Sequence, residues 1–257
     1  MKSVLIIGYG VVGHNLYKEL EKLCPDIYDK FKIEYNTKKN IKYDFAFICV
    51  DTPYIDKENG CDLSQVLEAL EENEADIYII KSTILPGSTE KLSKLTKKNI
   101  IFSPEFYGGT QHCNNFNFDF TILGGNKDDC CKVQQLLQEV YDARHTFRIV
   151  ETQTAEFTKY IENSYLKLMV LFCVQFSEAI KKFNDLYGTN IKYEDVRECW
   201  RLDPRTPESH TMVYDEHPFV DTHCLNKDPL AIAEFLDLDL LKAVEAFNNK
   251  QKEKYKK

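Results

Sequence analysis

The chain has 257 residues, and 33 Lys and Arg against 41 Asp and Glu give it a formal net charge of −8. A hydrophobic fraction of 43% excludes a disordered chain, and the length suffices for one large domain or two smaller ones without disulfides. The acidic balance excludes a sequence-independent nucleic-acid binder. No apolar run approaches the roughly 20 residues that span a bilayer, and the Met1 end lacks a signal-peptide layout. Nine scattered cysteines without a CxxC pair predict a reducing, cytoplasmic environment and no metal site.

Short apolar segments alternate with amphipathic helices over residues 1–150. This alternation predicts an α/β domain with a doubly wound, mostly parallel sheet that is covered by helices on both faces. The expected strands are 3–7, 45–50, 77–80, 100–102, 121–123 and 146–150, and the expected helices are 11–23, 62–72, 88–95 and 127–141.

Residues 151–257 are expected to form a separate, all-helical domain. Between Thr154 and Tyr187 there is no Gly or Pro, and apolar residues recur at helical spacing, which predicts one long helix ended by Gly188 in a left-handed cap. The middle of this 154–187 helix is apolar on more than one face, so we expect a second copy of the same helix to cover it in a homodimer.

The rest of this domain is expected to consist of shorter helices and one irregular stretch. A helix is predicted at 193–202, followed by an irregular stretch at 203–226. A last helix should begin at Pro229 with Asp228 as its N-cap, because proline fits the first helical position. The lysine-rich residues from Lys250 are predicted to form a solvated tail.

The most specific motif is Gly8-Tyr9-Gly10-Val11-Val12-Gly13, a complete GxGxxG between an apolar strand and a helix. Gly8 permits the tight turn, Gly10 lets the backbone approach a pyrophosphate, and Gly13 allows close packing of helix on strand. The N–H groups at the start of the helix, including those of Val11 and Val12, favour a negatively charged ligand. The motif predicts a Rossmann-like nucleotide site.

An acidic residue should follow this loop and bind the adenosine ribose. Asp29 lies 21 residues after Gly8, and Glu34 is the other candidate. A carboxylate at this position favours NAD over NADP because it repels a 2′-phosphate. Three nearby lysines argue the other way, namely Lys30, Lys38 and Lys39.

Five further segments occur in the same order as motifs of a known family. They are Val50-Asp51-Thr52-Pro53 with Asp62-Leu63, then Lys81-Ser82-Thr83, Ser103-Pro104-Glu105-Phe106, the run from Ala155 to Asn163, and Cys224-Leu225-Asn226-Lys227-Asp228. Together with the glycine loop they resemble the UDP-glucose/GDP-mannose dehydrogenase family. The resemblance implies an NAD-dependent oxidoreductase that acts on the CH–OH group of a nucleotide sugar or related sugar, in nucleotide-sugar metabolism and polysaccharide biosynthesis.

The resemblance also implies roles for individual residues. The cofactor-binding set is Gly8, Gly10, Val11, Val12, Gly13, Asp29, Val50, Thr52, Pro53, Ser82 and Thr83. The catalytic set is Cys224, Lys159, Asn163, Asp228, Glu105 and Thr83. The substrate-binding set is Glu105, Phe106, Lys159, Asn163, Arg205 and Lys227.

The chemistry of alcohol oxidation asks for such residues independently of any family. Lys159 and Asn163 are spaced i, i+4, so an ammonium and an amide share one helix face and can stabilise an oxyanion. Cys224 can trap an aldehyde as a thiohemiacetal, which loses a second hydride and becomes a thioester, and Lys227 can lower the pKa of its thiol. His223 is not expected to pair with Cys224, because neighbours on an extended chain point apart.

Each of these residues also has a plain structural explanation. In that explanation Cys224 is a small buried apolar residue and Asp228 is a helix cap. Lys159 and Asn163 then belong to a solvated helix face.

Three features depart from the family pattern. Gly109 stands where the family has a second glutamate, and Phe219-Val220-Asp221-Thr222-His223 replaces a glycine-rich loop and adds a carboxylate. The resemblance does not extend to the family's C-terminal, nucleotide-binding domain. A different alcohol substrate, or a partner chain that supplies that domain, therefore stays open. Two alternatives are a two-electron β-hydroxyacid-type dehydrogenase that uses Lys159 and Asn163, and a non-catalytic NAD-binding paralogue.

Overall fold

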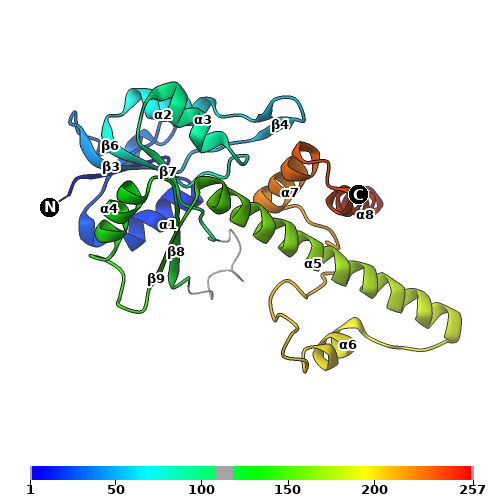
Figure 1. Cartoon of the computed structure of the whole chain (residues 1–257). Helices are drawn as coiled ribbons and strands as arrows, with labels where there is room; N and C mark the ends of the chain where they lie inside the picture. The colour runs from blue at the N-terminus through cyan, green and yellow to red at the C-terminus, as the bar shows by residue number, and fades with distance from the viewer. Residues whose placement is uncertain (1, 108–117, 256–257) are drawn as a thin grey trace. The chain divides into compact units, whose positions relative to one another are not determined.

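The computed structural model describes residues 2–107 and 118–255 (Figure 1). The chain divides into two compact units, Met1–Lys159 and Tyr160–Lys257, and the boundary falls inside one long helix.

The first unit is built on a seven-stranded sheet with the order β2-β1-β3-β6-β7-β8-β9. Its strands are β1 (Val4–Ile7), β2 (Asp26–Tyr28), β3 (Tyr43–Ile48), β6 (Ala75–Ile80), β7 (Ile100–Phe102), β8 (Phe120–Gly124) and β9 (Thr146–Val150). All neighbours pair in parallel except β7 and β8. The chain leaves β1 for β2 on one side and crosses to β3 on the other, which creates a switch point beside β1.

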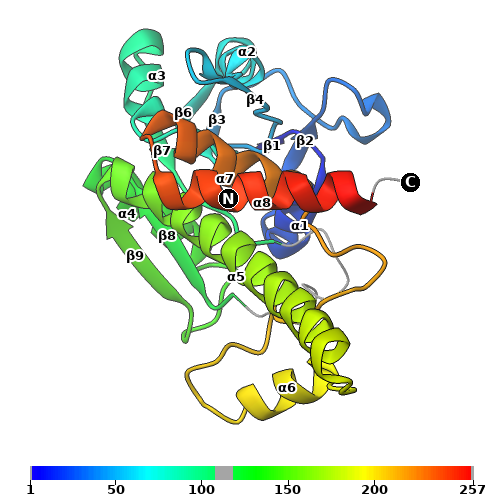
Figure 2. The same cartoon turned by 90° about the vertical axis from the view of Figure 1, so that its right-hand side faces the viewer.

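Helices cover both faces of this sheet (Figures 1 and 2). One face carries α1 (Val11–Glu19) and α4 (Lys127–Leu137), and the other carries α2 (Ser64–Glu72) and α3 (Ser88–Thr96). Alternate strand residues serve the two cores: Ile6 packs with Leu16, whereas Leu5 packs with Leu70. The predicted doubly wound α/β fold is confirmed.

Three small features of the first unit were not predicted. The strand β2 was missed because its residues, Asp26, Ile27 and Tyr28, form no apolar run. A hairpin of β4 (Tyr54–Asp56) and β5 (Gly60–Cys61) follows β3, and a 3-10 turn, η2 (Ile33–Tyr35), comes after β2.

The predicted helix 11–23 is wrong at its end, because α1 stops at Glu19 and a separate 3-10 turn, η1 (Glu21–Leu23), follows. Cys24 then adopts a left-handed φ of 50°, and Pro25 disfavours helical geometry in the residue before it. The helix predicted at 127–141 likewise ends earlier, at Leu137.

The second unit is helical. It contains most of α5 (Thr152–Tyr187), then α6 (Tyr193–Trp200), α7 (His223–Phe235) and α8 (Asp239–Tyr255), and α7 lies beside α8 (Figures 1 and 2). The long helix is confirmed, and so is its cap: Gly188 has φ +65° and donates its N–H to the Asn184 carbonyl. None of the described helices is both long enough and apolar enough to cross a membrane.

The prediction for the last helix is wrong. The helix α7 begins at His223 after Thr222, and Pro229 lies within it, so Asp228 is an interior helical residue and not an N-cap. Proline removes one intrahelical hydrogen bond there. It is tolerated because the following turn packs in the core with Ala231 and Ile232.

The predicted solvated tail from Lys250 is also wrong. The helix α8 continues to Tyr255, and Gln251 is buried against Glu178.

Candidate functional site

The glycine loop has the geometry that its spacing predicts. Gly8 has φ +89°, and a Cβ there would lie 2.6 Å from the Cys49 carbonyl oxygen. A Cβ on Gly13 would lie 1.9 Å from the Gly8 carbonyl oxygen, so α1 packs against the loop only because this residue is glycine. Gly10, the residue before α1, has nothing within 4 Å of that position. The first turn of α1 is therefore open on the side where Gly10 lies.

A pocket of about 340 Å³ lies beside this loop, at the carboxyl ends of β1, β2 and β3. It is lined by Gly8, Gly10, Asp29, Phe31, Val50 and Asp51, among others. Ligands of open α/β sheets bind in this place, outside the carboxyl ends of the strands at the switch point. Four of the predicted cofactor residues thus line one pocket, while Val11 lies exposed at the start of α1.

Asp29 holds the glycine loop as well as lining this pocket. Its Oδ2 accepts the N–H of Tyr9 at 2.6 Å, and its Oδ1 accepts those of Phe31 and Lys32 at 2.8 and 2.9 Å. Burial acts to raise the pKa of Asp29, but these three backbone hydrogen bonds outweigh it and the pKa is lowered. The carboxylate is ionised, and Oδ2 retains room for a second donor such as a ribose hydroxyl.

The three lysines near Asp29 have partners within the protein. Lys30 forms an ion pair with Glu68, Lys39 lies 3.1 Å from Asp26, and Lys38 donates to the Glu72 carbonyl. These contacts occupy the cations that would otherwise favour a 2′-phosphate. Sequence reasoning missed Phe31, an exposed ring two residues after Asp29 that lines the pocket. Its position two residues after the acidic residue was the available signal.

The hydroxyl groups after β3 and β6 join two loops. Thr52 Oγ1 donates to the Thr83 carbonyl at 2.7 Å, and Ser82 Oγ donates to the Val50 carbonyl at 2.6 Å. Thr83 is half-buried and Pro53 is exposed. These residues shape the loops beside the pocket.

Glu105 and Lys159 form a buried pair in the first unit. Their exposed fractions are 5% and 3%, and Lys159 Nζ lies 3.5 Å from Glu105 Oε1. Lys159 Nζ also lies 5.1 Å from the centre of the Phe106 ring, and the Tyr107 N–H donates to Glu105 Oε2. Lys159 therefore does not belong to a solvated helix face, and three predicted residues are brought together.

Lys81 supports this pair in a way that was not predicted. Its buried ammonium donates to Ser103 Oγ at 3.2 Å and to the Pro104 carbonyl at 3.5 Å, directly before Glu105. Burial lowers the pKa of Lys81 and raises that of nearby Cys49 to about 12. Cys49 lines the nucleotide pocket but stays a neutral thiol, so it is no candidate nucleophile.

Glu156, three residues before Lys159, has a structural role. Its buried carboxylate accepts the N–H groups of Gly87 and Thr89 at 2.6 and 3.0 Å and the Thr89 hydroxyl at 2.7 Å. Because Gly87 has no side chain to cap α3, Glu156 performs that function from α5. The contact fixes the turn of α5 that carries Lys159.

Asn163 and Asp228 form the corresponding buried pair in the second unit. The Asn163 Nδ2 donates to Asp228 Oδ2 at 2.5 Å, and the exposed fractions are 3% and 0%. Lys227 Nζ lies 2.8 Å from Asp228 Oδ1. Cys224 is exposed. It lies three residues before Lys227 and four before Asp228 on α7, and therefore on the same side of that helix. Cys224 is therefore not a buried apolar residue.

The remaining predictions have other outcomes. Arg205 lies on the irregular segment, 88% exposed, and its guanidinium pairs with Asp203. Gly109 lies outside the described residues. The extended chain predicted at His223 and Cys224 is wrong, since both begin α7; consecutive helical residues also point in different directions.

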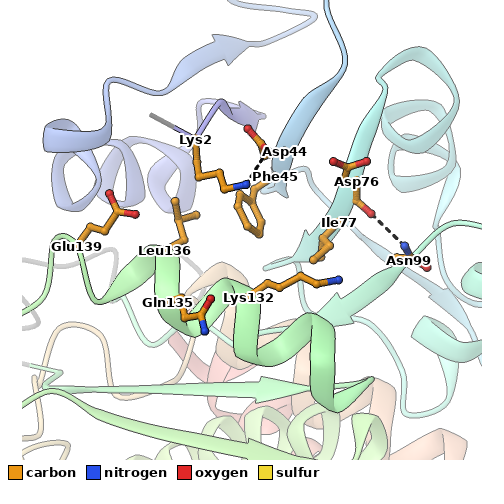
Figure 3. A pocket seen from close by; sticks show the side chains of 10 residues that line it. All are labelled: Lys2, Asp44, Phe45, Asp76, Ile77, Asn99, Lys132, Gln135, Leu136 and Glu139. Carbon is orange, nitrogen blue, oxygen red and sulfur yellow. Dashed lines mark hydrogen bonds and ion pairs between the residues drawn. The ribbon is translucent and has the colours of Figure 1, made fainter.

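A larger cavity of about 550 Å³ lies at the opposite, amino ends of the strands (Figure 3). Lys2 lies 3.2 Å from Asp44 there, and Lys132 lies 3.0 Å from Asp129. These cations already have acidic partners, and the cavity is on the other edge of the sheet from the glycine loop. It has no part in the nucleotide site.

A dinucleotide-binding fold that carries a buried lysine–glutamate pair, followed by a helical unit with a buried asparagine–aspartate pair, defines a dehydrogenase-type architecture. Residues 14–145 match the model of the NAD-binding domain, and residues 153–250 the model of the central domain, of the UDP-glucose/GDP-mannose dehydrogenase family. The chain belongs to this family.

Similar curated proteins include the UDP-N-acetyl-D-mannosamine dehydrogenase of Methanococcus vannielii, 29% identical over 91% of this chain and 62% of that protein. The UDP-glucose 6-dehydrogenase of Rickettsia prowazekii is 27% identical over 94% of this chain and 62% of its own length. The chain thus spans less than two thirds of these relatives.

Two solved structures show the fold. A UDP-glucose dehydrogenase from Pyrobaculum islandicum has a TM-score of 0.79 at 20% identity, covering 97% of this chain and 68% of that chain. The 3-hydroxyisobutyrate dehydrogenase of Mycobacterium tuberculosis has a TM-score of 0.65 at 13% identity, covering 99% of this chain and 95% of its own.

Proposed function

We propose that this protein is an NAD-dependent dehydrogenase that oxidises an alcohol carbon of a nucleotide sugar. The observation that carries the proposal is the pair of buried polar contacts on neighbouring turns of α5, Lys159 with Glu105 and Asn163 with Asp228. Burying such groups costs free energy unless they are paired, and their pairing in a chain with an NAD-binding domain supports a catalytic role.

In the first step bound NAD would accept a hydride from the alcohol carbon, and the hydroxyl proton would pass to water. Lys159 and Asn163 are four residues apart on one helix, and they stabilise the negative charge that develops on the oxygen. The products are an aldehyde, reduced NAD and a proton. NAD would supply the hydride acceptor; Asp29 would hold its adenosine ribose, and the open turn at Gly10 would hold its pyrophosphate.

In the second step the Cys224 thiolate adds to the aldehyde carbon. The resulting thiohemiacetal would give up a hydride, for which a second NAD would be the acceptor, and water would cleave the thioester so formed to the acid and the free thiol. Lys227 lies one helical turn after Cys224 and supports the thiolate, and Glu105 and Asp228 position the water. One substrate then reduces two NAD.

The test is to incubate the protein with NAD and a panel of UDP-sugars and GDP-mannose, following absorbance at 340 nm and product mass. We expect NADH and a uronic acid to form from at least one nucleotide sugar. NAD binding without turnover on the whole panel would contradict it and favour the non-catalytic paralogue.

A second candidate is a two-electron dehydrogenase of the β-hydroxyacid type. The fold is compatible with it, since the mycobacterial 3-hydroxyisobutyrate dehydrogenase superposes on 99% of this chain. In this reaction Lys159 and Asn163 suffice and Cys224 takes no part. Turnover of short hydroxyacids, with one NADH per substrate, would support this candidate.

We also propose a homodimer through α5. Beyond the unit boundary this helix exposes an apolar stripe at helical spacing: Ile161, Tyr165, Phe172, Phe176, Phe183 and Tyr187. A second copy of the stripe is the proposed cover, with two-fold symmetry. Light scattering should give about twice the 30.0 kDa chain mass, and a monomer at micromolar concentration would contradict the proposal.

A further inference from the structure

The last helix binds the segment that leads into Cys224. Asn248 on α8 is fully buried; its Oδ1 accepts the Val220 N–H at 2.8 Å and its Nδ2 donates to the Val220 carbonyl at 3.0 Å. One side chain thus satisfies both backbone polar groups of a buried residue that belongs to no helix or strand.

Lys252 reaches the same segment from the next turn of α8. Its Nζ donates to Asn226 Oδ1 at 2.9 Å and lies 3.8 Å from Asp221 Oδ1. The contacts of Asn248 and Lys252 therefore fall on both sides of Cys224 along the chain. Lys252 also offsets the charge of Asp221, the carboxylate that replaces the family's glycine-rich loop.

Other side chains attach α8 to α5. Glu245 forms an ion pair with the fully buried Lys167, and burial lowers the pKa of that lysine. Gln251 donates to Glu178 at 2.9 Å, and Lys254 pairs with the same carboxylate. These contacts hold α8 without touching residues 220–226, so α8 can serve as a fixed support.

We propose that α8 is a clamp that positions Cys224, with Asn248 and Lys252 as its positioning residues. Cys224 is the second residue of α7, so its place depends on where the first turn of α7 is held. A contribution of this clamp to catalysis rests on the proposed function, in which Cys224 is the nucleophile. The clamp itself concerns only the reactivity of one thiol.

The loss of the clamp should lower that reactivity. Without Asn248 the N–H and carbonyl of Val220 lose their buried partners, and the segment must move to satisfy them. The first turn of α7 then loosens, and its N–H groups stabilise a thiolate less well.

The first test compares Asn248→Leu with Gln251→Leu. Both replace a buried amide on the same side of α8, but Gln251 binds only α5. The readout is alkylation of Cys224 by iodoacetamide at pH 7, divided by that of Cys199, which is exposed on α6. Peptide mass spectrometry measures the alkylation of both cysteines in the same sample. A general loss of stability therefore affects the two cysteines together and not their ratio.

The ratio should fall by about fivefold or more in Asn248→Leu and stay within about twofold in Gln251→Leu. An equal change in the two variants, or no fall in Asn248→Leu, would overturn the clamp.

A second set of three variants covers the case in which Asn248→Leu does not fold. Lys252→Met should lower the ratio, Lys252→Arg should restore it, and Lys254→Met, which removes the contact with Glu178 instead, should leave it unchanged. A ratio that is the same in Lys252→Met and Lys254→Met would overturn the proposal. Alkylation needs neither NAD nor substrate, so the test of the clamp is independent of the test of the proposed function. The clamp proposal can be supported even if the protein oxidises no nucleotide sugar, and it can be overturned even if the protein does.

Discussion

Asn163 donates a 2.5 Å hydrogen bond to Asp228, and both side chains are buried. The contact joins α5 to α7, the helix that begins with the predicted nucleophile. Because Lys227 also lies 2.8 Å from the other carboxylate oxygen, Asp228 is the common partner of an amide and an ammonium.

Replacing this carboxylate should therefore destabilise the protein. Asp228→Ala removes the carboxylate that the buried Asn163 and the mostly buried Lys227 contact, and we expect a loss of about 2–4 kcal/mol in the free energy of unfolding. Asp215→Ala is the control, since Asp215 is exposed and pairs only at the surface with Lys181; it should cost less than about 0.5 kcal/mol. Urea denaturation measures both, and equal losses would refute the importance of the buried pair.

The second prediction concerns the choice of cofactor. NAD should bind more tightly than NADP, and Asp29→Asn should narrow that difference because it removes the charge that repels a 2′-phosphate. Asp29→Ala should weaken NAD binding as well, by about tenfold or more, because the Tyr9 N–H in the glycine loop loses its acceptor. Titration calorimetry gives the affinities of the three proteins for NAD and for NADP. Equal affinities for NAD and NADP in the unmutated protein would count against this role of Asp29.

The lowered pKa of Asp29 predicts a pH dependence of stability. A carboxyl group whose pKa is lower in the folded than in the unfolded state stabilises the fold above the unfolded pKa, near 4. That contribution disappears as the pH falls through the folded pKa. The stability difference between wild type and Asp29→Asn should thus be constant from about pH 5 to 7 and shrink below about pH 4. A difference that stays the same down to pH 3 would contradict the assignment.

Glu156 should matter for stability and not for chemistry. Glu156→Ala removes three hydrogen bonds at the start of α3 and should cost about 1–3 kcal/mol. Glu156→Gln retains an acceptor and should keep the rate of NADH formation within about threefold, whereas Lys159→Met should reduce it about a hundredfold or more. Initial rates per folded molecule decide this. A loss in Glu156→Gln as large as that in Lys159→Met would place Glu156 in the catalytic machinery.

Local sequence signals predicted the parts of the molecule that depend on local physics. The glycine loop follows from the close approach of Gly8 and Gly13 to neighbouring backbone, and α5 with its cap at Gly188 follows from unbroken helical spacing. The switch point beside β1 then places Asp29 and Val50 at one pocket.

The sequence-based predictions failed where contacts between residues far apart in the chain determine the local structure. Pro229 was taken as a helix start by its own preference, but the packing of the following turn keeps it inside α7. Glu156 was indistinguishable in sequence from its motif neighbours, because its partners lie on α3, 69 and 67 residues away. The clamp residues Asn248 and Lys252 lay in or next to a stretch that was taken for a tail, and only the contact with residues 220–226 reveals them.

The most direct test of the central claim is the number of NAD molecules reduced per nucleotide sugar consumed, in wild type and in Cys224→Ala. We expect two NADH and an acid for the wild type. For Cys224→Ala we expect at most one NADH, with the reaction stopped at the aldehyde. A ratio of one in both proteins would contradict the covalent step and leave Lys159 and Asn163 as the catalytic pair of a two-electron dehydrogenase.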